Sequence, residues 1–122
     1  QHPNRVCAIP SLGQKRYLST VKNAAAVIGN SSSGIIEVPA FNVPTVNIGV
    51  RQKGRLAAKS VLNCIATKTA ISAAITTAVT GSYKTPGETI INPYGAGNAS
   101  AHAIQMLKSL EFEPCKPFYD LK

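Results

Sequence analysis

Residues 26–38, with the sequence AVIGNSSSGIIEV, carry the clearest structural pattern of the chain. Three apolar residues lead to Gly29, small polar residues follow it, and apolar residues return from Ile35 onward. This order predicts a short strand, a tight turn and the first turn of a helix. The first N–H groups of a helix have no partner within the helix and carry the positive end of its dipole, so the turn is a candidate anion site.

The residues of this turn are suited to a phosphate group. Ser31, Ser32 and Ser33 can donate hydroxyl hydrogen bonds without adding bulk, and the lack of a side chain at Gly34 would let the backbone come close. Glu37 follows within a turn and can accept from ribose hydroxyls, so the pattern predicts a nucleotide ligand. The simpler interpretation is an ordinary helix N-cap, since Asn and Ser are preferred there. We call residues 30–34 the serine turn.

A second polar segment, RQKGR at residues 51–55, follows the apolar run 44–50. We call it the basic loop. If residues 45–48 form the next parallel strand, the carboxyl ends of the two strands lie side by side and the loop reaches the anion site. Arg51 can bind a phosphate or a carboxylate with two donors, and Gly54 lets the loop bend. The simpler interpretation is a solvated basic loop.

The rest of the chain alternates between strand and helix patterns. Strands are predicted over residues 5–9, 25–29, 45–48 and 61–64, and helices over 14–23, 69–79 and 98–110. A helix from Ser33 or Gly34 to Phe41 contains Pro39, which must shorten or kink it. Residues 81–97 are predicted to form a loop, and 111–122 an irregular tail. Such alternation predicts an α/β fold with parallel strands and crossover helices.

Four motifs together resemble the UDP-N-acetylglucosamine 2-epimerase family. They are the run 28–37, PTVNIG at 44–49, RQKGR at 51–55 and NPYG at 92–95, and their order and spacing cover about residues 4–110. The closest likeness is to the hydrolysing branch, which makes N-acetylmannosamine and UDP. Hydrolysing 2-epimerases of GDP-sugars share these motifs, so the resemblance leaves the choice between UDP and GDP open.

The resemblance implies that the chain is part of a larger enzyme. Family members have two Rossmann-type domains facing each other in the glycosyltransferase-B arrangement, and this chain matches the last part of the second domain. Residues 1–97 would be the carboxy-terminal nucleotide-binding half-domain, and 98–122 a crossover helix and tail that pack on the missing amino-terminal domain. The acid/base residues of the family lie upstream, so no catalytic residue is expected here and the chain alone should be inactive. Ala96 stands where the family has an acid.

The resemblance also implies roles for individual residues. Ser31 and Ser32 would bind the diphosphate, helped by the backbone of Ser33 and Gly34, and Glu37 would bind both ribose hydroxyls. Arg51 would lie near the phosphates. Arg55, Lys53 and the base-binding loop around Leu12 are secondary candidates. UDP or a UDP-sugar is the expected partner, with no cofactor and no metal, and the full-length enzyme is expected to be a homo-oligomer.

Composition fits a piece of a basic α/β protein. The formal net charge is +8, and Glu37 is the one acid that precedes Glu88. Such charge attracts polyanions in general, but seven aromatic residues with no stacking row argue against nucleic acid. A non-catalytic nucleotide-binding module is the alternative from a different class.

The three cysteines, Cys7, Cys64 and Cys115, are too far apart for a Cys-x-x-Cys pair. They are expected to be reduced, with Cys7 and Cys64 buried in strands, which predicts a cytoplasmic protein. No membrane span or leader is expected.

Overall fold

The computed structural model describes residues 3–111 of the chain. Its centre is a three-stranded parallel sheet in the order β1-β2-β3. The strands are β1 (Val27–Gly29), β2 (Thr45–Ile48) and β3 (Val61–Cys64). In the register, Gly29 pairs with Asn47, and Ile48 pairs with Cys64. The α/β class with parallel strands is confirmed, and the parallel pairing places the carboxyl ends of β1 and β2 side by side as predicted.

Helices connect and follow the strands. They are η1 (Pro3–Arg5), α1 (Gly13–Lys22), α2 (Ser33–Ile36), η2 (Val38–Phe41), α3 (Lys68–Thr80) and α4 (Ala99–Ser109). Thr67 caps α3, because its hydroxyl oxygen accepts from the Ala70 N–H at 3.3 Å. Gly81 ends α3 with a φ of 75°, a conformation that glycine adopts without strain. The predicted helices over 14–23, 69–79 and 98–110 are confirmed.

The helix after β1 is interrupted where Pro39 predicts an interruption. The α-helical part, α2, has four residues, and η2 continues as a 3-10 helix. Pro39 has no N–H for the Ile35 carbonyl and its ring would crowd that carbonyl, so the α-helical pattern cannot continue through it. Asn42, with a φ of 57°, then turns the chain into β2.

Apolar side chains from the helices pack together beside the sheet. Val21 of α1, Val38 of η2 and Val43 form one buried cluster. Ile35 of α2 and Val46 of β2 are also fully buried. This packing holds the segment between β1 and β2 against the sheet, so the start of α2 has a defined position at its carboxyl edge.

The strand predicted over residues 5–9 is absent. Arg5 ends η1 and the following residues are irregular, with Val6 72 % exposed and Ile9 53 % exposed. Cys7 is exposed, so its predicted burial in a strand is wrong, whereas Cys64 is half-buried in β3. An extended segment becomes a strand only when a sheet edge pairs with it, and the described part of the chain brings none to this segment.

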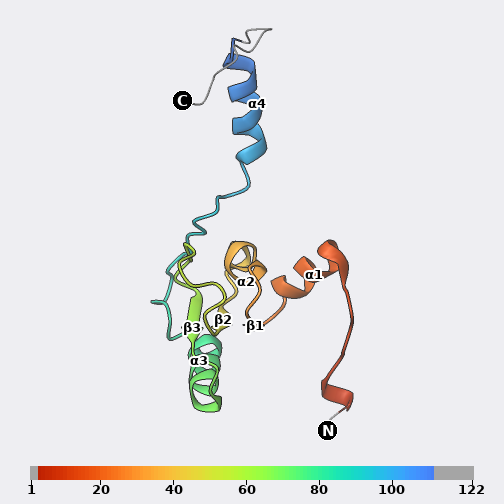
Figure 1. Cartoon of the computed structure of the whole chain (residues 1–122), viewed down its shortest axis with the longest axis vertical. Coiled ribbons are helices and arrows are strands. Elements are labelled where there is room, and N and C mark those ends of the chain that lie inside the picture. Colours follow the sequence, from red (N-terminus) through yellow and green to blue (C-terminus); the bar gives the residue numbers. More distant parts are fainter. Residues whose placement is uncertain (1–2, 112–122) are drawn as a thin grey trace, which may run out of the picture.

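The last helix stands away from the sheet. Figure 1 shows α4 beyond a long connection, and none of its residues is buried. Its apolar residues Ile104 and Leu107 are more than half exposed. The tail predicted over 111–122, with Cys115, lies outside the described residues except for Glu111. No helix in residues 3–111 is long and apolar enough to span a membrane.

Candidate functional site

The serine turn directly follows β1, and its three hydroxyls have different surroundings. The Ser33 hydroxyl is 2.7 Å from the Tyr17 hydroxyl of α1, so the two share a hydrogen bond. Ser31 is exposed, and its hydroxyl oxygen accepts a long bond of 3.4 Å from the Ser33 N–H. Ser32 precedes α2, and its side chain makes no capping bond. Ser31 and Ser32 are therefore the hydroxyls that a ligand can use.

Backbone N–H groups of the turn are also free to donate. The N–H groups of Gly34 and Ile35 already donate to the carbonyls of Ser31 and Ser32, at 3.2 and 3.0 Å. Within residues 3–111, neither the Ser31 N–H nor the Ser32 N–H donates a hydrogen bond. Because α2 is short, these local donors matter more than the summed helix dipole.

Gly34 has a packing role. A Cβ atom at this position would lie 2.7 Å from Cγ2 of Thr45, and the Thr45 hydroxyl donates to the Gly34 carbonyl at 2.6 Å. Gly34 is buried, and its N–H is already bonded within the turn. The absence of a side chain lets α2 lie close to β2, which corresponds to the close helix–strand contact that glycine permits in Rossmann-type turns.

Glu37 ends α2 one helical turn after the serine turn. Its backbone N–H donates to the Ser33 carbonyl at 2.9 Å. The side chain is half-buried, and within the described part of the chain its carboxylate has neither an ion pair nor a hydrogen bond. Both carboxylate oxygens can therefore accept from a ligand.

The basic loop reaches back to the serine turn through Gln52. The side-chain Nε2 of Gln52 donates to the Asn30 carbonyl at 2.8 Å, and Gln52 is only 6 % exposed. The predicted approach of the basic loop to the turn is confirmed, but the residue that makes the contact was not singled out. The sequence did not indicate this role for Gln52, because the burial of a single polar side chain in a charged loop depends on how the loop folds.

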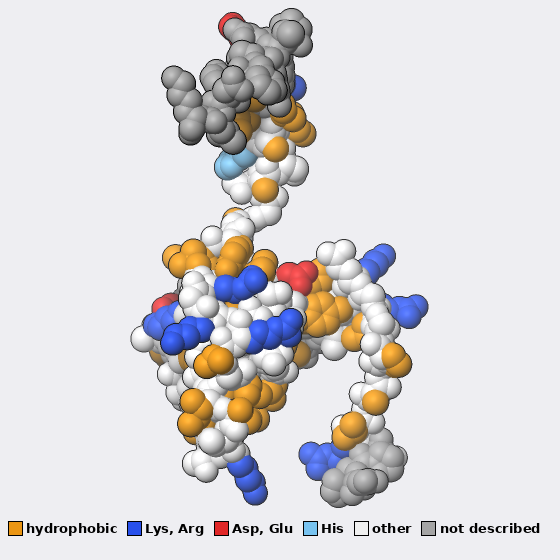
Figure 2. Space-filling view, in the orientation of Figure 1, with side chains coloured by type: hydrophobic (Ala, Val, Ile, Leu, Met, Phe, Trp, Pro, Cys, Tyr) orange, Lys and Arg blue, Asp and Glu red, His pale blue; other side chains and the backbone are white. Residues whose placement is uncertain are grey.

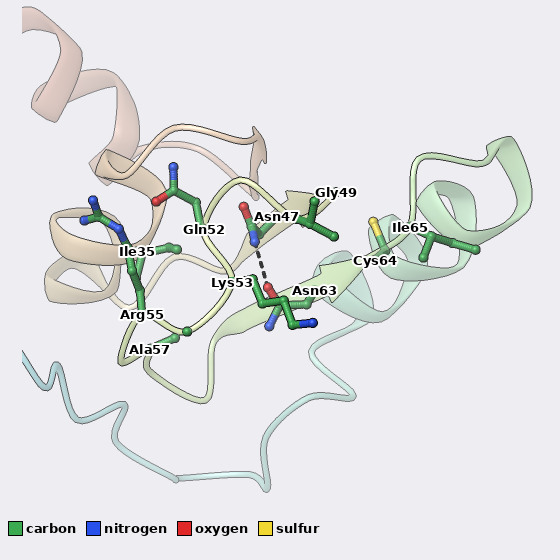
Figure 3. A pocket seen from close by; sticks show the side chains of 12 residues that line it. Ile35, Asn47, Gly49, Gln52, Lys53, Arg55, Ala57, Asn63, Cys64 and Ile65 are labelled. Carbon is green, nitrogen blue, oxygen red and sulfur yellow. Dashed lines mark hydrogen bonds between the residues drawn. The ribbon is translucent and has the colours of Figure 1, made fainter.

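A cavity of about 370 Å³ opens beside this contact, at the carboxyl ends of β2 and β3 (Figure 3). Asn47 donates from its side chain to the Oδ1 of Asn63 at 2.7 Å, and both residues line the cavity. The basic loop contributes Gln52, Lys53 and Arg55, and α2 contributes Ile35. The cavity thus combines amide groups, cations and an apolar wall.

The predicted site residues are only partly brought together. Arg51 and Arg55 are both exposed, and of the two only Arg55 lines the cavity. The serines, Glu37 and Leu12 also lie outside the cavity lining, and Leu12 is half-buried at the start of α1. Figure 2 shows several Lys and Arg side chains exposed on the visible face of the central body, in keeping with the positive net charge. Within residues 3–111 there is no group of three or more metal-binding side chains.

The NPYG motif forms hydrogen bonds with two segments of the candidate site. The Asn92 side chain donates to the Ile36 carbonyl at 3.1 Å, next to Glu37 in the sequence. The Tyr94 hydroxyl donates to the Leu56 carbonyl at 2.8 Å, next to Arg55. The motif therefore holds the end of α2 and the end of the basic loop in place.

An ion pair fastens the same long connection elsewhere. Both carboxylate oxygens of Glu88 lie 2.9 Å from Lys59 Nζ, and Glu88 also accepts from the N–H and hydroxyl of Thr85. The hydrogen bond from Lys59 and those from Thr85 lower the pKa of Glu88 from 4.5 to about 2.

The variant Glu88→Gln is expected to lower the free energy of unfolding at neutral pH. A carboxylate with a lowered pKa stabilises the fold above its unfolded pKa, and this contribution disappears as the pH falls from 4.5 towards about 2. The difference between the wild-type chain and the variant should therefore shrink over this interval. Urea unfolding at several pH values measures it, and a difference that grows on acidification would refute the assignment.

The parallel sheet, with its small-residue turn and polar loop at the carboxyl edge, defines a Rossmann-like α/β unit. Comparison with known proteins narrows this class. The UDP-N-acetylglucosamine 2-epimerase family matches residues 1–108. The chain belongs to this family, which confirms the resemblance seen in its motifs.

Individual relatives agree with the family. The chain is 37 % identical over 114 residues to the polysialic acid biosynthesis protein P7 of Escherichia coli, covering 91 % of this chain and 29 % of that protein. It is 34 % identical over 109 residues to the UDP-N,N'-diacetylbacillosamine 2-epimerase (hydrolyzing) of Legionella pneumophila, covering 89 % and 28 %. A 53-residue match at 55 % identity, covering 43 % and 14 %, links it to the GDP/UDP-N,N'-diacetylbacillosamine 2-epimerase (hydrolyzing) of Campylobacter jejuni. The chain spans less than a third of these relatives.

Proposed function

We propose that this chain supplies the UDP-binding part of a hydrolysing UDP-N-acetylglucosamine 2-epimerase, which converts UDP-N-acetylglucosamine into N-acetylmannosamine and UDP. One observation carries the proposal. The serine turn presents free N–H groups and the hydroxyls of Ser31 and Ser32, Glu37 lies one helical turn away, and Gln52 attaches the basic loop to the turn. These are the donors, acceptor and cations that a nucleoside diphosphate needs.

Each part of the ligand has a matching group. The diphosphate would accept from the hydroxyls and N–H groups of Ser31 and Ser32, while Ser33 stays bonded to Tyr17. The ribose hydroxyls would donate to the two oxygens of Glu37. Arg51 and Arg55, from opposite ends of the basic loop, would balance the phosphate charge. The loop around Leu12 is the proposed place for the base.

The chemistry of the reaction gives this part of the enzyme one task. A base removes the proton from C2 of the sugar while UDP leaves, and water then adds to the unsaturated sugar to give the 2-epimer. Negative charge builds on the departing diphosphate, and preorganised N–H groups and guanidinium groups stabilise it. The acid/base residues are proposed to lie upstream, so the chain alone would bind the ligand without turnover.

The remaining chain is proposed to join the two halves of the enzyme. Residues 98–122 would cross to the amino-terminal domain, and the exposed Ile104 and Leu107 of α4 are suited to packing there. The whole enzyme would be a homo-oligomer. A cytoplasmic location is proposed as well, and within residues 3–111 Cys7 and Cys64 form no disulfide with each other.

A GDP-sugar is the second candidate substrate. The relative from Campylobacter jejuni is a GDP/UDP-N,N'-diacetylbacillosamine 2-epimerase (hydrolyzing), and its matching segment is 55 % identical to this chain. Both nucleotides carry the same diphosphate and ribose, so the serine turn and Glu37 would serve either of them. The two candidate nucleotides differ only in the nucleobase, so the residues that bind the nucleobase would decide between them.

Amide NMR of the isotopically labelled chain tests the proposal. Inorganic pyrophosphate is expected to shift the amide signals of Ser31 and Ser32, because their N–H groups are free. Uridine, which lacks phosphate, serves as the control ligand and should leave these two signals in place. If pyrophosphate shifts the amide signals of lysines and arginines but not those of Ser31 and Ser32, the serine turn is not the anion site.

A further inference from the structure

We propose that Gln52 is a positioning residue whose side-chain amide fastens the basic loop to the serine turn. This inference rests on the proposed function, since the anion bound by the two segments is taken to be the diphosphate. Gln52 Nε2 donates to the Asn30 carbonyl at 2.8 Å across 22 residues of sequence. With an exposed fraction of 6 %, the contact is largely protected from competition by water.

The backbone around Gln52 transmits this contact to the cations. The Lys53 N–H donates to the Val50 carbonyl at 3.0 Å, and the Arg55 N–H donates to the Gln52 carbonyl at 3.2 Å. These bonds make the basic loop a compact series of turns with Gln52 inside it. A fixed position of the Gln52 side chain therefore also limits the positions of Lys53 and Arg55, which follow it in these turns.

The other end of the amide shows why packing alone does not explain a glutamine here. Gln52 Oε1 is buried and has no hydrogen-bond partner in the described part of the chain. An unpaired buried carbonyl oxygen is unfavourable, and methionine would fill a similar space without a polar atom. The hydrogen bond from Nε2 to the Asn30 carbonyl therefore explains a glutamine at this position. Figure 3 shows Gln52 and Arg55 extending from the loop beside Ile35 of α2.

If Gln52 positions the basic loop, its loss should affect only ligands that carry a phosphate. If its role is only structural, its loss should affect all ligands alike. The attraction between the loop cations and a phosphate falls with distance, so a loosened loop weakens the binding of a phosphate-bearing ligand. Uridine has no phosphate and does not draw on these cations. Loss of the bond from Gln52 to Asn30 should therefore weaken the binding of UDP and leave the binding of uridine nearly unchanged.

Gln52→Met tests the inference, with Gln105→Met as the matched control. Gln105 is exposed in α4 and lines none of the cavity, so the same chemical change there alters neither segment. Calorimetry is expected to show UDP binding to Gln52→Met weakened about tenfold, with uridine binding changed less than about twofold. Gln105→Met should leave the ratio of UDP to uridine affinity unchanged.

Several results would overturn the inference. Equal weakening of UDP and uridine binding in Gln52→Met, or a similar loss of UDP affinity in Gln105→Met, would make Gln52 merely structural. If the wild-type chain binds neither ligand, the proposed function fails, and amide hydrogen exchange then tests the bond between the two segments separately. Faster exchange at Ser33 and Gly34 in Gln52→Met, but not in Gln105→Met, would support the inference. Unchanged exchange would reject it.

Discussion

Replacing Glu37 with alanine is expected to weaken UDP binding by about 1–3 kcal/mol, because alanine cannot accept the charge-assisted hydrogen bonds of the ribose hydroxyls. The backbone bond from the Glu37 N–H to Ser33 does not involve the side chain, so the turn should keep its conformation. Calorimetric titration of both proteins with UDP measures the difference.

Two controls make the Glu37 result specific. Glu88→Gln also removes a carboxylate, but one whose partners are Lys59 and Thr85, so UDP affinity should not change. A UDP analogue without the 2′-hydroxyl should lose less affinity on Glu37→Ala than UDP does, because one of the two bonds is already missing. Equal losses for the two ligands would show that Glu37 acts at a distance and does not hold the ribose.

Replacing Gly34 with alanine is expected to destabilise the fold by about 1–3 kcal/mol, the usual effect of forcing a methyl group into packed structure. The new Cβ would lie 2.7 Å from Cγ2 of Thr45, so α2 and β2 would have to move apart. Urea unfolding of the two proteins gives the change in free energy.

A second substitution checks the cause of this effect. Thr45→Ser removes Cγ2 and keeps the hydroxyl that donates to the Gly34 carbonyl. In the Thr45→Ser background, Gly34→Ala should therefore be much less destabilising. A Gly34→Ala chain as stable as the wild type, or a loss that is the same in both backgrounds, would contradict the packing role of Gly34.

Local patterns predicted the elements that depend on local chemistry. The short, largely apolar runs at 45–48 and 61–64 became β2 and β3 with the same bounds. The central strand β2 is buried over Thr45–Asn47, as expected for a strand with a neighbour on each side, whereas the edge strand β3 is only partly buried. Pro39 marked the end of α2 because its effect on a helix is covalent. Small polar residues also placed the serine turn between β1 and α2, since such residues favour turns and helix starts. The role of Ser31, Ser32 and Glu37 in binding a nucleotide stays a prediction.

Features that depend on distant partners could not be predicted in this way. Residues 5–9 have a strand-like composition, but a strand needs an available sheet edge, and composition says nothing about that. Gln52 looks like one polar residue in a charged loop until the loop folds onto Asn30. Arg51 and Arg55 are chemically equal in sequence, and only the turns of the loop place Arg55 at the cavity.

Titration calorimetry of the 122-residue chain with UDP and with GDP shows whether this chain binds a nucleotide by itself. We expect saturable binding of UDP that Glu37→Ala weakens, since the free N–H groups of the serine turn and the Glu37 carboxylate belong to this chain. Tighter binding of GDP would assign the same site to the GDP-sugar branch of the family. The absence of saturable binding by either nucleotide would contradict the claim that this chain carries a formed nucleotide site.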